Sequence, residues 1–416
     1  MFSVKVIIFT ISCVIIAYCL GRHGAVHSDE ALLRSYSQPP PWVVWNTFIP
    51  AVKSIETFFI KNKPPPFQML DHLMAFGKVQ VIHVLARLDV AEVLAIKGPS
   101  LTPSELCAHI TCDYDSLERM LHAAVSIGVF EYDPTSTDGV KFRNNAVSAI
   151  LRQSHPNTLR CLVLRMGMEA FTVWNHMYDA VKDSTVSAFQ RAHPQYKSLP
   201  ANESIWKFFA DHPDKEANFA CAMSNVDVFG MSSVVEDYPW ASYKRAIDIG
   251  GSKGTTLFAI MTAVPHLEGV LFDREPVIKL AKEAWESDRR ELMNRISFVA
   301  GSFFDVSTIP RGMDGDVYIL RVVLHDWNDD AVLTILKGIR TAIGTSNATL
   351  AIIEQSFHDD VDSDWIKRFL DLQMLTFNGR ERTPKMWKSL FEASGFTYVR
   401  SVLTRSPFIV TEAAAK

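Results

Sequence analysis

Beyond Tyr243 the chain alternates short apolar runs with longer segments of helical periodicity, and this alternation narrows the possible folds most. Strands that alternate with helices form a parallel sheet covered by helices on both faces. The predicted strands are Arg245–Ile249, Gly269–Phe272, Ile296–Val299, Asp316–Leu320 and Thr349–Ile353. A last pair, Phe396–Val402 and Pro407–Thr411, is expected to close the sheet edge. The sequence therefore predicts an α/β fold for this part of the chain.

The segment from Phe67 to about Leu151 has a different pattern, of helices followed by a hairpin. Thr102 is predicted to cap a helix that Pro103 opens, and a second capped helix follows at Asp115. Two short strands with a turn between them come next. Helix, turn, helix and hairpin follow one another in the order of a winged helix.

A winged helix that binds DNA needs positive charge on its second helix, and the helix expected from Tyr114 to Val125 carries a single arginine, Arg119. The whole chain has 42 Lys and Arg against 46 Asp and Glu, which gives a formal net charge of -4. Binding to nucleic acid depends on neutralising phosphates with basic side chains. We therefore expect no nucleic-acid partner.

An uncharged apolar run covers residues 6–20 near the N-terminus. It is slightly shorter than the roughly 17 to 25 residues of a membrane-spanning helix and also fits a signal peptide. We favour an uncleaved membrane anchor over a cleaved signal, because Gly24-Ala25-Val26-His27 is a poor cleavage site. Residues 30–66 are expected to form a linker, since triple prolines bracket an amphipathic run from Trp42 to Ile60.

The six cysteines lie at positions 13, 19, 107, 112, 161 and 221, without a CxxC pair or histidines at zinc spacing. We interpret them as mostly buried thiols. Cys107 and Cys112 could form a disulfide in an oxidising compartment, and the sequence leaves this open. Asp360, Asp362 and Asp364 have the spacing of a calcium loop but not its glycine or final glutamate. We expect no metal site.

A glycine turn, Asp248–Gly254, joins the first predicted strand to a helix. Glycines let a ligand approach the backbone, and the helix amide ends favour polar groups. Asp273 ends the next strand, about twenty residues on, where a carboxylate suits ribose hydroxyls. Ser302 and Phe303 follow the third strand. Because ligands bind at the carboxyl ends of strands in open α/β sheets, these ends predict one binding crevice.

His325 follows the fourth strand, in Leu324-His325-Asp326-Trp327. A single histidine is more often structural, but Glu354 ends the fifth strand and Glu381 lies in Gly379-Arg380-Glu381-Arg382-Thr383. A carboxylate that binds one imidazole nitrogen fixes the tautomer and supports the cation formed when the other nitrogen takes a proton. We therefore expect His325 to be a general base positioned by two carboxylates.

These segments resemble those of the caffeic-acid and hydroxyindole type of S-adenosylmethionine-dependent O-methyltransferase, over roughly residues 67 to 412. The resemblance implies a Rossmann-like class I methyltransferase sheet over 237–416. It also implies a mostly helical winged-helix dimerisation domain over 67–236, which lends residues to the acceptor pocket. The anchor or signal at 1–29 and the linker at 30–66 precede both. S-adenosylmethionine is the implied donor, a small phenol or indole the implied acceptor, and a homodimer the implied assembly.

By the same resemblance the catalytic histidine is His325, and Glu354 and Glu381 are its supporting glutamates. The implied cofactor-binding residues are Asp248, Gly250, Gly251, Asp273, Ser302, Phe303 and Arg321. The implied walls of the acceptor pocket are Phe171, Trp174, Phe219, Met223, Asp326 and Met374, with plain core packing as the alternative. Ser252 and Ser302 depart from the family, which usually has a glycine and an aspartate there, and both changes could lower cofactor affinity.

A non-catalytic, membrane-tethered binding or scaffolding protein with the same fold is the alternative function, and the presence of His325, Glu354 and Glu381 argues against it. We expect the catalytic domain to be cytosolic at the endoplasmic reticulum membrane, because the methyl donor is made in the cytosol. A lumenal or secreted domain is the alternative. Two glycosylation sequons, at Asn202 and Asn347, have meaning only in that second case.

Overall fold

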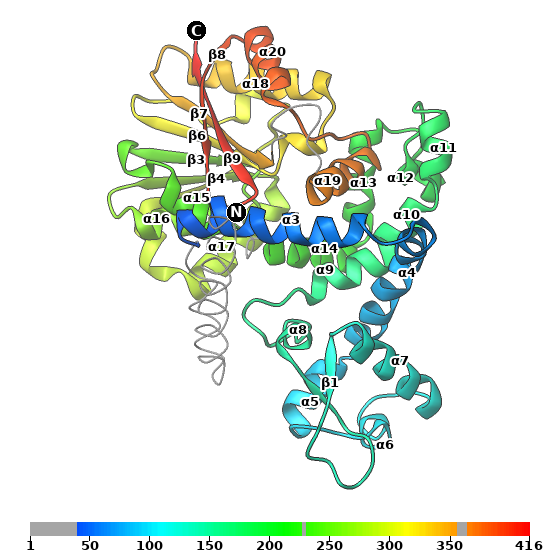
Figure 1. Cartoon of the computed structure of the whole chain (residues 1–416). Helices are drawn as coiled ribbons and strands as arrows, with labels where there is room; N and C mark the ends of the chain where they lie inside the picture. The colour runs from blue at the N-terminus through cyan, green and yellow to red at the C-terminus, as the bar shows by residue number, and fades with distance from the viewer. Residues whose placement is uncertain (1–39, 227–229, 356–363) are drawn as a thin grey trace, which may run out of the picture. The chain divides into compact units, whose positions relative to one another are not determined.

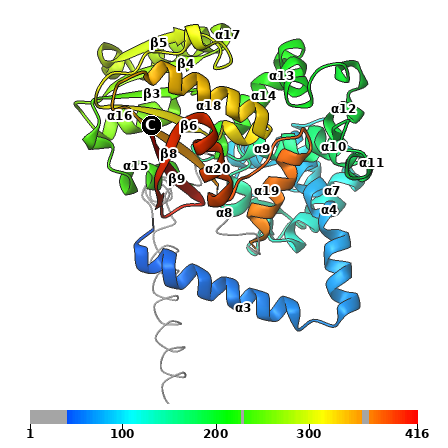
Figure 2. The same cartoon turned by 90° about the horizontal axis from the view of Figure 1, so that it is seen from above.

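The computed structural model describes residues 40–226, 230–355 and 364–416, which divide into two compact units (Figures 1 and 2). The first unit comprises 40–172 and 214–226, and the second comprises 173–213, 230–355 and 364–416. The apolar run at 6–20 lies outside the described residues, as do Asp360 and Asp362. Within the described ranges, no helix has both the length and the apolar character that crossing a membrane requires.

The first unit is mostly helical. Its elements are the π-helical turn η1 (Val44–Phe48), α3 (Ile49–Lys61), α4 (Pro65–Arg87), α5 (Val90–Lys97), α6 (Pro103–Cys107), α7 (Tyr114–Ser126), β1 (Phe130–Tyr132), β2 (Phe142–Asn144), α8 (Ala146–Ala149), α9 (Arg160–Arg165), the π-helical turn η2 (Met166–Ala170) and α14 (Pro213–Val226). Leu85, Leu94, Leu117, Leu121 and Phe142 are fully buried or nearly so and form its core.

The predicted order of helix, turn, helix and hairpin is confirmed by α6, α7 and the antiparallel pair β1 and β2. Thr102 caps α6, because its hydroxyl accepts the N–H of Glu105 and the Glu105 carboxylate accepts the N–H of Thr102. The cap of α7 is Asp113, two residues earlier than Asp115, since Asp113 Oδ1 accepts the N–H of Ser116.

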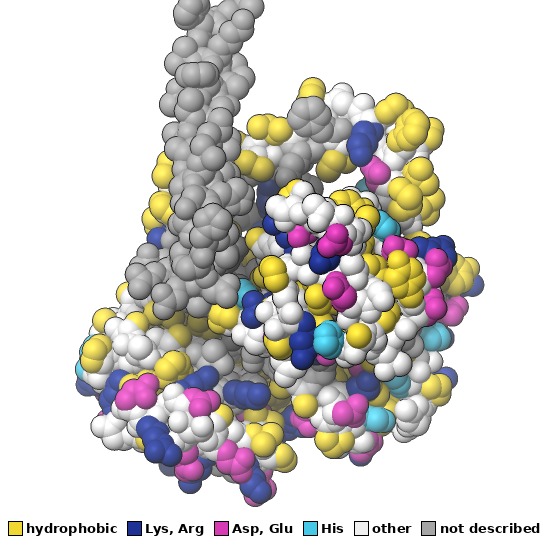
Figure 3. All heavy atoms as spheres, turned by 90° about the horizontal axis from the view of Figure 1, so that it is seen from below, with side chains coloured by type: hydrophobic (Ala, Val, Ile, Leu, Met, Phe, Trp, Pro, Cys, Tyr) yellow, Lys and Arg dark blue, Asp and Glu magenta, His cyan; other side chains and the backbone are white. Residues whose placement is uncertain are grey.

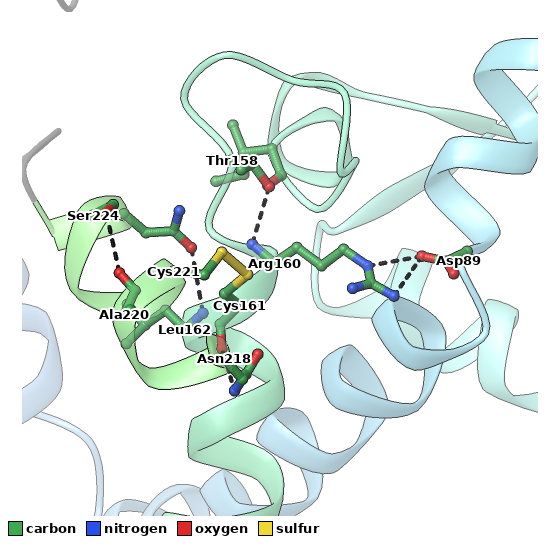
Figure 4. The surroundings of a disulfide bond; sticks show 11 residues. Asp89, Thr158, Arg160, Cys161, Leu162, Asn218, Ala220, Cys221 and Ser224 are labelled. Atoms are coloured by element: carbon green, nitrogen blue, oxygen red, sulfur yellow. Dashed lines mark hydrogen bonds and ion pairs between the residues drawn. A yellow bond between two sulfur atoms is a disulfide. The ribbon is translucent and has the colours of Figure 1, made fainter. Parts of the chain in front are cut away.

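Two disulfides correct the expectation of mostly buried thiols. Cys107 is bonded to Cys112, with 5.5 Å between Cα atoms, and Cys161 is bonded to Cys221, with 5.7 Å between Cα atoms. The second pair joins α9 to α14 (Figure 4), which are separated by 60 positions in sequence. Spacing along the chain gave no indication of this pairing, because only the packing of α9 beside α14 brings the two side chains together.

The second unit holds the sheet and the remaining helices. Its elements are α11 (Met177–Lys182), α12 (Ala188–Ala192), η3 (Pro194–Tyr196), α13 (Ala201–Asp211), α15 (Met231–Asp237), η5 (Trp240–Ser242), β3 (Arg245–Ile249), α16 (Thr255–Ala263), β4 (Glu268–Asp273), α17 (Glu275–Asp288), η6 (Arg290–Arg295), β5 (Ile296–Ala300), η7 (Val306–Thr308), β6 (Asp316–Arg321), η8 (Leu324–Asp326), α18 (Asp329–Ile343), β7 (Thr349–Gln355), α19 (Trp365–Leu375), α20 (Pro384–Ser394), β8 (Phe396–Leu403) and β9 (Phe408–Ala415). Helix α10 (Phe171–Trp174) crosses from the first unit to the second.

The sheet has seven strands in the order β5-β4-β3-β6-β7-β9-β8 (Figure 1). The five strands predicted first are parallel to one another, whereas β9 is antiparallel to β7 and to β8. The last pair is therefore confirmed at the sheet edge, where β8 is the outermost strand. The strand order reverses between β3 and β6, so the carboxyl ends of these two strands flank the position where ligands bind in such sheets.

Apolar side chains bury both faces of the parallel strands. Ile247, Ile249, Phe272, Leu320 and Ile352 are almost completely buried, as near-continuous apolar runs require. Helix α16 packs against β3 and β4, α17 against β4 and β5, and α20 against β8 and α18. Figure 2 shows α18 and α20 side by side along the sheet.

Candidate active site

The glycine turn after β3 has the backbone of a tight ligand-binding loop. Gly250 and Gly254 have φ of 72° and 70°, and Ser252 has a φ of 52°, in the left-handed region that side chains other than glycine rarely adopt. A Cβ on Gly251 would lie 2.5 Å from a Leu271 methyl carbon and 2.6 Å from the buried Asp248 carboxyl. The turn therefore needs glycine at this position for close packing against side chains of both β3 and β4.

Asp273, at the end of β4, is fixed beside this turn. Its Oδ2 accepts the backbone N–H of Ser252 at 2.9 Å, and its Oδ1 accepts the N–H of Arg274 at 2.7 Å. A carboxylate at this position, at the end of the second strand, suits hydrogen bonding to ribose hydroxyls. The sequence prediction that Asp273 and the glycine turn share one crevice is consistent with this geometry.

The loop after β5 brings an aromatic side chain to the same turn. A Cβ on Gly250 would lie 3.8 Å from Phe303 Cε1 and 3.1 Å from a Val323 methyl carbon. Phe303 also packs edge-on against Trp327, with ring centroids 5.6 Å apart. Ser302 donates its N–H to Thr308 Oγ1 at 3.0 Å and accepts the N–H of Phe304 through Oγ at 3.3 Å.

Asp248 and Arg321, the other two residues predicted to bind the cofactor, lie in the strands that flank the switch point. Asp248 belongs to β3 and is almost fully buried under the glycine turn. Arg321 ends β6, and its Nη1 lies 3.4 Å from Thr256 Oγ1 in the first turn of α16. The Arg321 guanidinium also lies 5.0 Å from the ring centroid of Phe408.

The chain turns sharply where β6 ends, and this turn presents His325. Val322 has a φ of 55°, which is a strained conformation for a β-branched residue, and its N–H donates to Ile353 O at 3.0 Å. The one-turn 3₁₀ helix η8 follows and contains His325. Strained backbone of this kind is common at functional sites.

The two glutamates hold His325 in different ways. Glu381 Oε1 lies 2.7 Å from His325 Nδ1 and is bonded to the ring. Glu354 Oε1 instead accepts the backbone N–H of His325 at 2.9 Å. His325 Nε2 lies 3.6 Å from Asp326 Oδ1, which is longer than a hydrogen bond. The prediction that both carboxylates bind the imidazole therefore holds for Glu381 alone, and Glu354 positions the main chain.

Burial and charge oppose each other at this histidine. Burial lowers the pKa of His325, but the charges of Glu381 and Asp326 and the hydrogen bond that the ring donates to Glu381 outweigh it and raise the pKa to about 10. Burial raises the pKa of the Glu354 carboxyl to about 7, against the charge of His325. Oε2 of both glutamates is buried and has no hydrogen-bond partner among the described residues. This excess of buried negative charge favours the protonated ring.

Three further residues, Arg382, Arg380 and Asp371, support the loop around His325, and the sequence alone gave none of them a role. Arg382 has a fully buried side chain, and it donates to Leu324 O at 2.8 Å, to Trp327 O at 2.7 Å and to Asp329 Oδ1 at 2.9 Å. These bonds fix the backbone on both sides of His325.

Gly379 makes the Arg380 contact possible, because a Cβ at position 379 would lie 2.4 Å from His325 O. Arg380 can thus donate its N–H to His325 O at 2.8 Å. The third support is Asp371, whose Oδ1 accepts the N–H of Glu381 at 3.0 Å. Gly379 and Arg382 both lie in Gly379-Arg380-Glu381-Arg382-Thr383, one of the segments that carry the family resemblance. Their place in this segment is the sequence signal that could have identified them.

The predicted acceptor-pocket residues are divided between the two units. Phe171, Phe219 and Met223 belong to the first, whereas Trp174, Asp326 and Met374 belong to the second. Trp174 Nε1 donates to Gln373 Oε1 at 2.9 Å, and its ring stacks on Phe369 with 5.6 Å between centroids. In the first unit the Arg165 guanidinium lies 4.6 Å from the ring centroid of Phe219. The pocket that all six residues would form remains a prediction.

Basic side chains on the face shown in Figure 3 do not form a separate patch. Arg119, the arginine of α7, lies 3.7 Å from Asp115 one turn away. Figure 3 shows a face of the molecule on which Lys and Arg side chains are interspersed with Asp and Glu. Among the described residues, no group of three or more His, Cys, Asp and Glu is arranged to hold a metal ion.

Comparisons with known proteins identify the family to which the chain belongs. Residues 174–397 match the model of the O-methyltransferase domain, and residues 70–154 match that of the O-methyltransferase dimerisation domain. Phenazine O-methyltransferase PhzM of Lysobacter antibioticus is 30% identical over 83% of this chain and 95% of its own length. Bovine acetylserotonin O-methyltransferase is 26% identical over 79% and 92%.

The fold is shared with human N-acetylserotonin methyltransferase, solved in complex with S-adenosylmethionine. Its TM-score is 0.75 at 22% identity, with 85% of this chain and 99% of that chain covered. The resemblance found in the sequence is thereby confirmed. The chain belongs to the O-methyltransferase family and is an S-adenosylmethionine-dependent O-methyltransferase.

Proposed function

We propose that this enzyme methylates a hydroxyl group of a small aromatic acceptor, with His325 as the general base. The observation that carries the proposal is the 2.7 Å contact between Glu381 Oε1 and His325 Nδ1. With Nδ1 donating to Glu381, the neutral ring has its lone pair on Nε2. Nε2 is then available to take a proton from an acceptor hydroxyl.

The surroundings of His325 suit a phenolic proton. A phenol has a pKa of about 10, and Glu381 and Asp326 raise the pKa of His325 to about 10. Proton transfer between groups of matched pKa costs little free energy. Glu381 also stabilises the imidazolium that forms, and Glu354 keeps the residue in place through its backbone N–H.

S-adenosylmethionine, when bound, supplies an electrophilic methyl group on a positively charged sulfur. That positive charge disfavours a protonated imidazole nearby. His325 would therefore lose its proton more readily once the donor site is filled, and donor binding would prepare the base.

The residues predicted to bind the donor are chemically suited to S-adenosylmethionine. Gly250 and Gly251 let the ligand approach the backbone, and the Asp273 carboxylate beside them would accept hydrogen bonds from the ribose hydroxyls. Phe303 would face the adenine ring, with Ser302 beside its amino group. Asp248 would contribute to donor binding from beneath the glycine turn, and Arg321 would contribute from the carboxyl end of β6.

Relatives favour a planar aromatic acceptor, since two of them are named for phenazine and acetylserotonin. In this proposal Phe171, Trp174, Phe219, Met223, Asp326 and Met374 form the walls of the acceptor pocket. Two copies of the chain would form a homodimer through the domain that matches the dimerisation model. The amino-terminal part of α4 supports this, because it exposes Phe67, Met69, Leu70, Leu73, Met74 and Phe76.

The test is a screen of phenolic, indolic and carboxylic acceptors with isotopically labelled donor, run on the wild-type chain and on His325→Ala. The variant should bind the donor normally and lose turnover by about 10²- to 10⁴-fold, because proton removal is lost. Unchanged turnover in the variant would contradict the general-base role. Donor binding without methylation of any acceptor by the wild-type chain would favour a non-catalytic binding protein.

A further inference from the structure

All four cysteines within the described residues are paired, and both pairs lie in the first unit. Cys107 ends α6 and is bonded to Cys112 in the loop before α7, whereas Cys161 and Cys221 lie in α9 and α14. Disulfides persist in oxidising compartments and are rare in the cytosol, where thiols are kept reduced. Two pairs without an odd thiol among these four cysteines fit a chain that folds under oxidising conditions.

Hydrogen bonds beside Cys161–Cys221 hold α9 and α14 in the relative position that the disulfide requires (Figure 4). Leu162 donates its N–H to Asn225 Oδ1 at 3.4 Å, and Asn218 Nδ2 lies 3.5 Å from Cys161 O. The bond also closes the part of the chain that leaves the first unit after 172 and returns at 214. The covalent link therefore joins the segments on either side of this excursion.

A second observation comes from the sequon Asn347-Ala348-Thr349 in the second unit. Asn347 is exposed in the loop before β7, and its Oδ1 accepts the N–H of Gly315 at 2.8 Å. An N-linked glycan is attached to Nδ2, so this hydrogen bond to Oδ1 can remain. Asn347 precedes the amino end of β7, whereas Glu354 lies at its carboxyl end. A glycan on Asn347 would therefore lie at the amino ends of the strands, away from the active site at their carboxyl ends.

The other sequon is less suitable in the folded chain. It lies in the first turn of α13, and the hydroxyl of its third residue, Ser204, is buried and donates to Ala201 O. The structure therefore distinguishes Asn347 from Asn202 as a place for a glycan.

We propose that this methyltransferase matures in an oxidising, glycosylating compartment, where both disulfides form and Asn347 carries an N-linked glycan. In each disulfide, two thiols lose two protons and two electrons to the disulfide of an oxidoreductase, which becomes a dithiol. At Asn347, Nδ2 loses a proton and bonds to C1 of an oligosaccharide, while the bond from C1 to a lipid diphosphate breaks and the diphosphate leaves.

This proposal takes the lumenal or secreted alternative in place of the cytosolic expectation. The apolar run at 6–20 is of the kind that directs a chain into the secretory route, as an anchor or as a signal. The proposal does not depend on the identity of the acceptor or on His325. It does require that S-adenosylmethionine, made in the cytosol, be carried across a membrane to reach the enzyme.

The test uses the full chain, expressed in animal cells and treated with an endoglycosidase that removes N-linked glycans. The wild-type chain and Asn202→Gln should both shift to lower mass on digestion, and Asn347→Gln should not. Absence of a shift in the wild-type chain, or a shift that persists in Asn347→Gln, would overturn the glycan assignment.

A thiol measurement on the same purified chains tests the disulfides separately. The denatured protein is treated with a maleimide before and after reduction, and labelled peptides are identified by mass spectrometry. Cys107, Cys112, Cys161 and Cys221 should react only after reduction. Labelling of these four cysteines without reduction would contradict an oxidising compartment, whatever the methyltransferase activity of the sample.

Discussion

The loop that holds His325 and the glycine turn that follows β3 are built in opposite ways. Around His325, charged side chains from separate parts of the chain fix one residue: Glu354 from β7, and Glu381 and Arg382 from the loop before α20. At the glycine turn, backbone shape dominates, and the side chains of Asp273, Trp285 and Arg289 bond to its main chain. We infer that single substitutions around His325 affect turnover strongly, whereas those near the turn mainly alter donor affinity.

The largest contrast is expected between Glu381→Gln and Asp273→Asn. Glu381→Gln removes the charge that orients and supports the imidazolium, so turnover should fall by about 10²- to 10⁴-fold with donor affinity unchanged. Asp273→Asn should weaken donor binding and largely keep turnover at saturating donor. Steady-state kinetics and calorimetric titration with S-adenosylmethionine measure both. Equal losses of turnover in the two variants would remove the distinction between the two regions.

Arg382→Met should destabilise the fold more than Asp273→Asn at the glycine turn. It leaves the carbonyls of Leu324 and Trp327 without their buried donor, which should lower the free energy of unfolding by about 3 kcal/mol. Arg380→Met is the matched control, because that side chain is 54% exposed and lies 3.5 Å from Asp329. The control should change stability by less than about 0.5 kcal/mol. Urea denaturation measures the free energy of unfolding of both variants. Similar losses would contradict the role of Arg382 in holding the loop around His325.

Stability should fall as the pH rises, because the folded site retains protons that the unfolded chain releases. The pKa of Glu354 is raised from 4.5 to about 7, and that of His325 from 6.5 to about 10. Each contribution is complete below the lower value and is lost as the pH passes the higher one. Thermal unfolding between about pH 5 and 10 measures this slope. Glu381→Gln should flatten it above pH 7, and an unchanged slope would argue against the His325–Glu381 pair.

The smallest effect is expected for Ser302→Asp, which introduces the aspartate usual in the family. An added charged acceptor for the adenine amino group should improve donor affinity by up to about tenfold, which corresponds to roughly 1.4 kcal/mol. Ser252→Gly is the control, because it relieves the backbone at a φ of 52° without adding a contact to adenine. It should raise stability rather than affinity. A weaker donor affinity in Ser302→Asp would show that Ser302 does not face the adenine.

Much of the fold and part of the site followed from the sequence. Alternating apolar and helical segments predicted five parallel strands and the final pair, because backbone periodicity is a local property of the chain. Since parallel strands bind ligands at their carboxyl ends, Gly250, Asp273 and His325 could be assigned to one edge of the sheet. Glu354 and Glu381 were proposed as partners of His325 from their positions in the sequence, and the resemblance to the family implied the same role.

Tertiary structure alone decided how these residues meet. In the folded chain Glu354 accepts the backbone N–H of His325, whereas Glu381 contacts its ring. The buried Arg382 donates to main-chain carbonyls on both sides of His325. Tertiary structure also paired Cys161 with Cys221 across 60 positions of sequence. Hydrogen bonds and disulfides depend on distances of a few ångströms between remote segments. Those distances are set by packing of the whole chain, and local sequence patterns carry no measure of them.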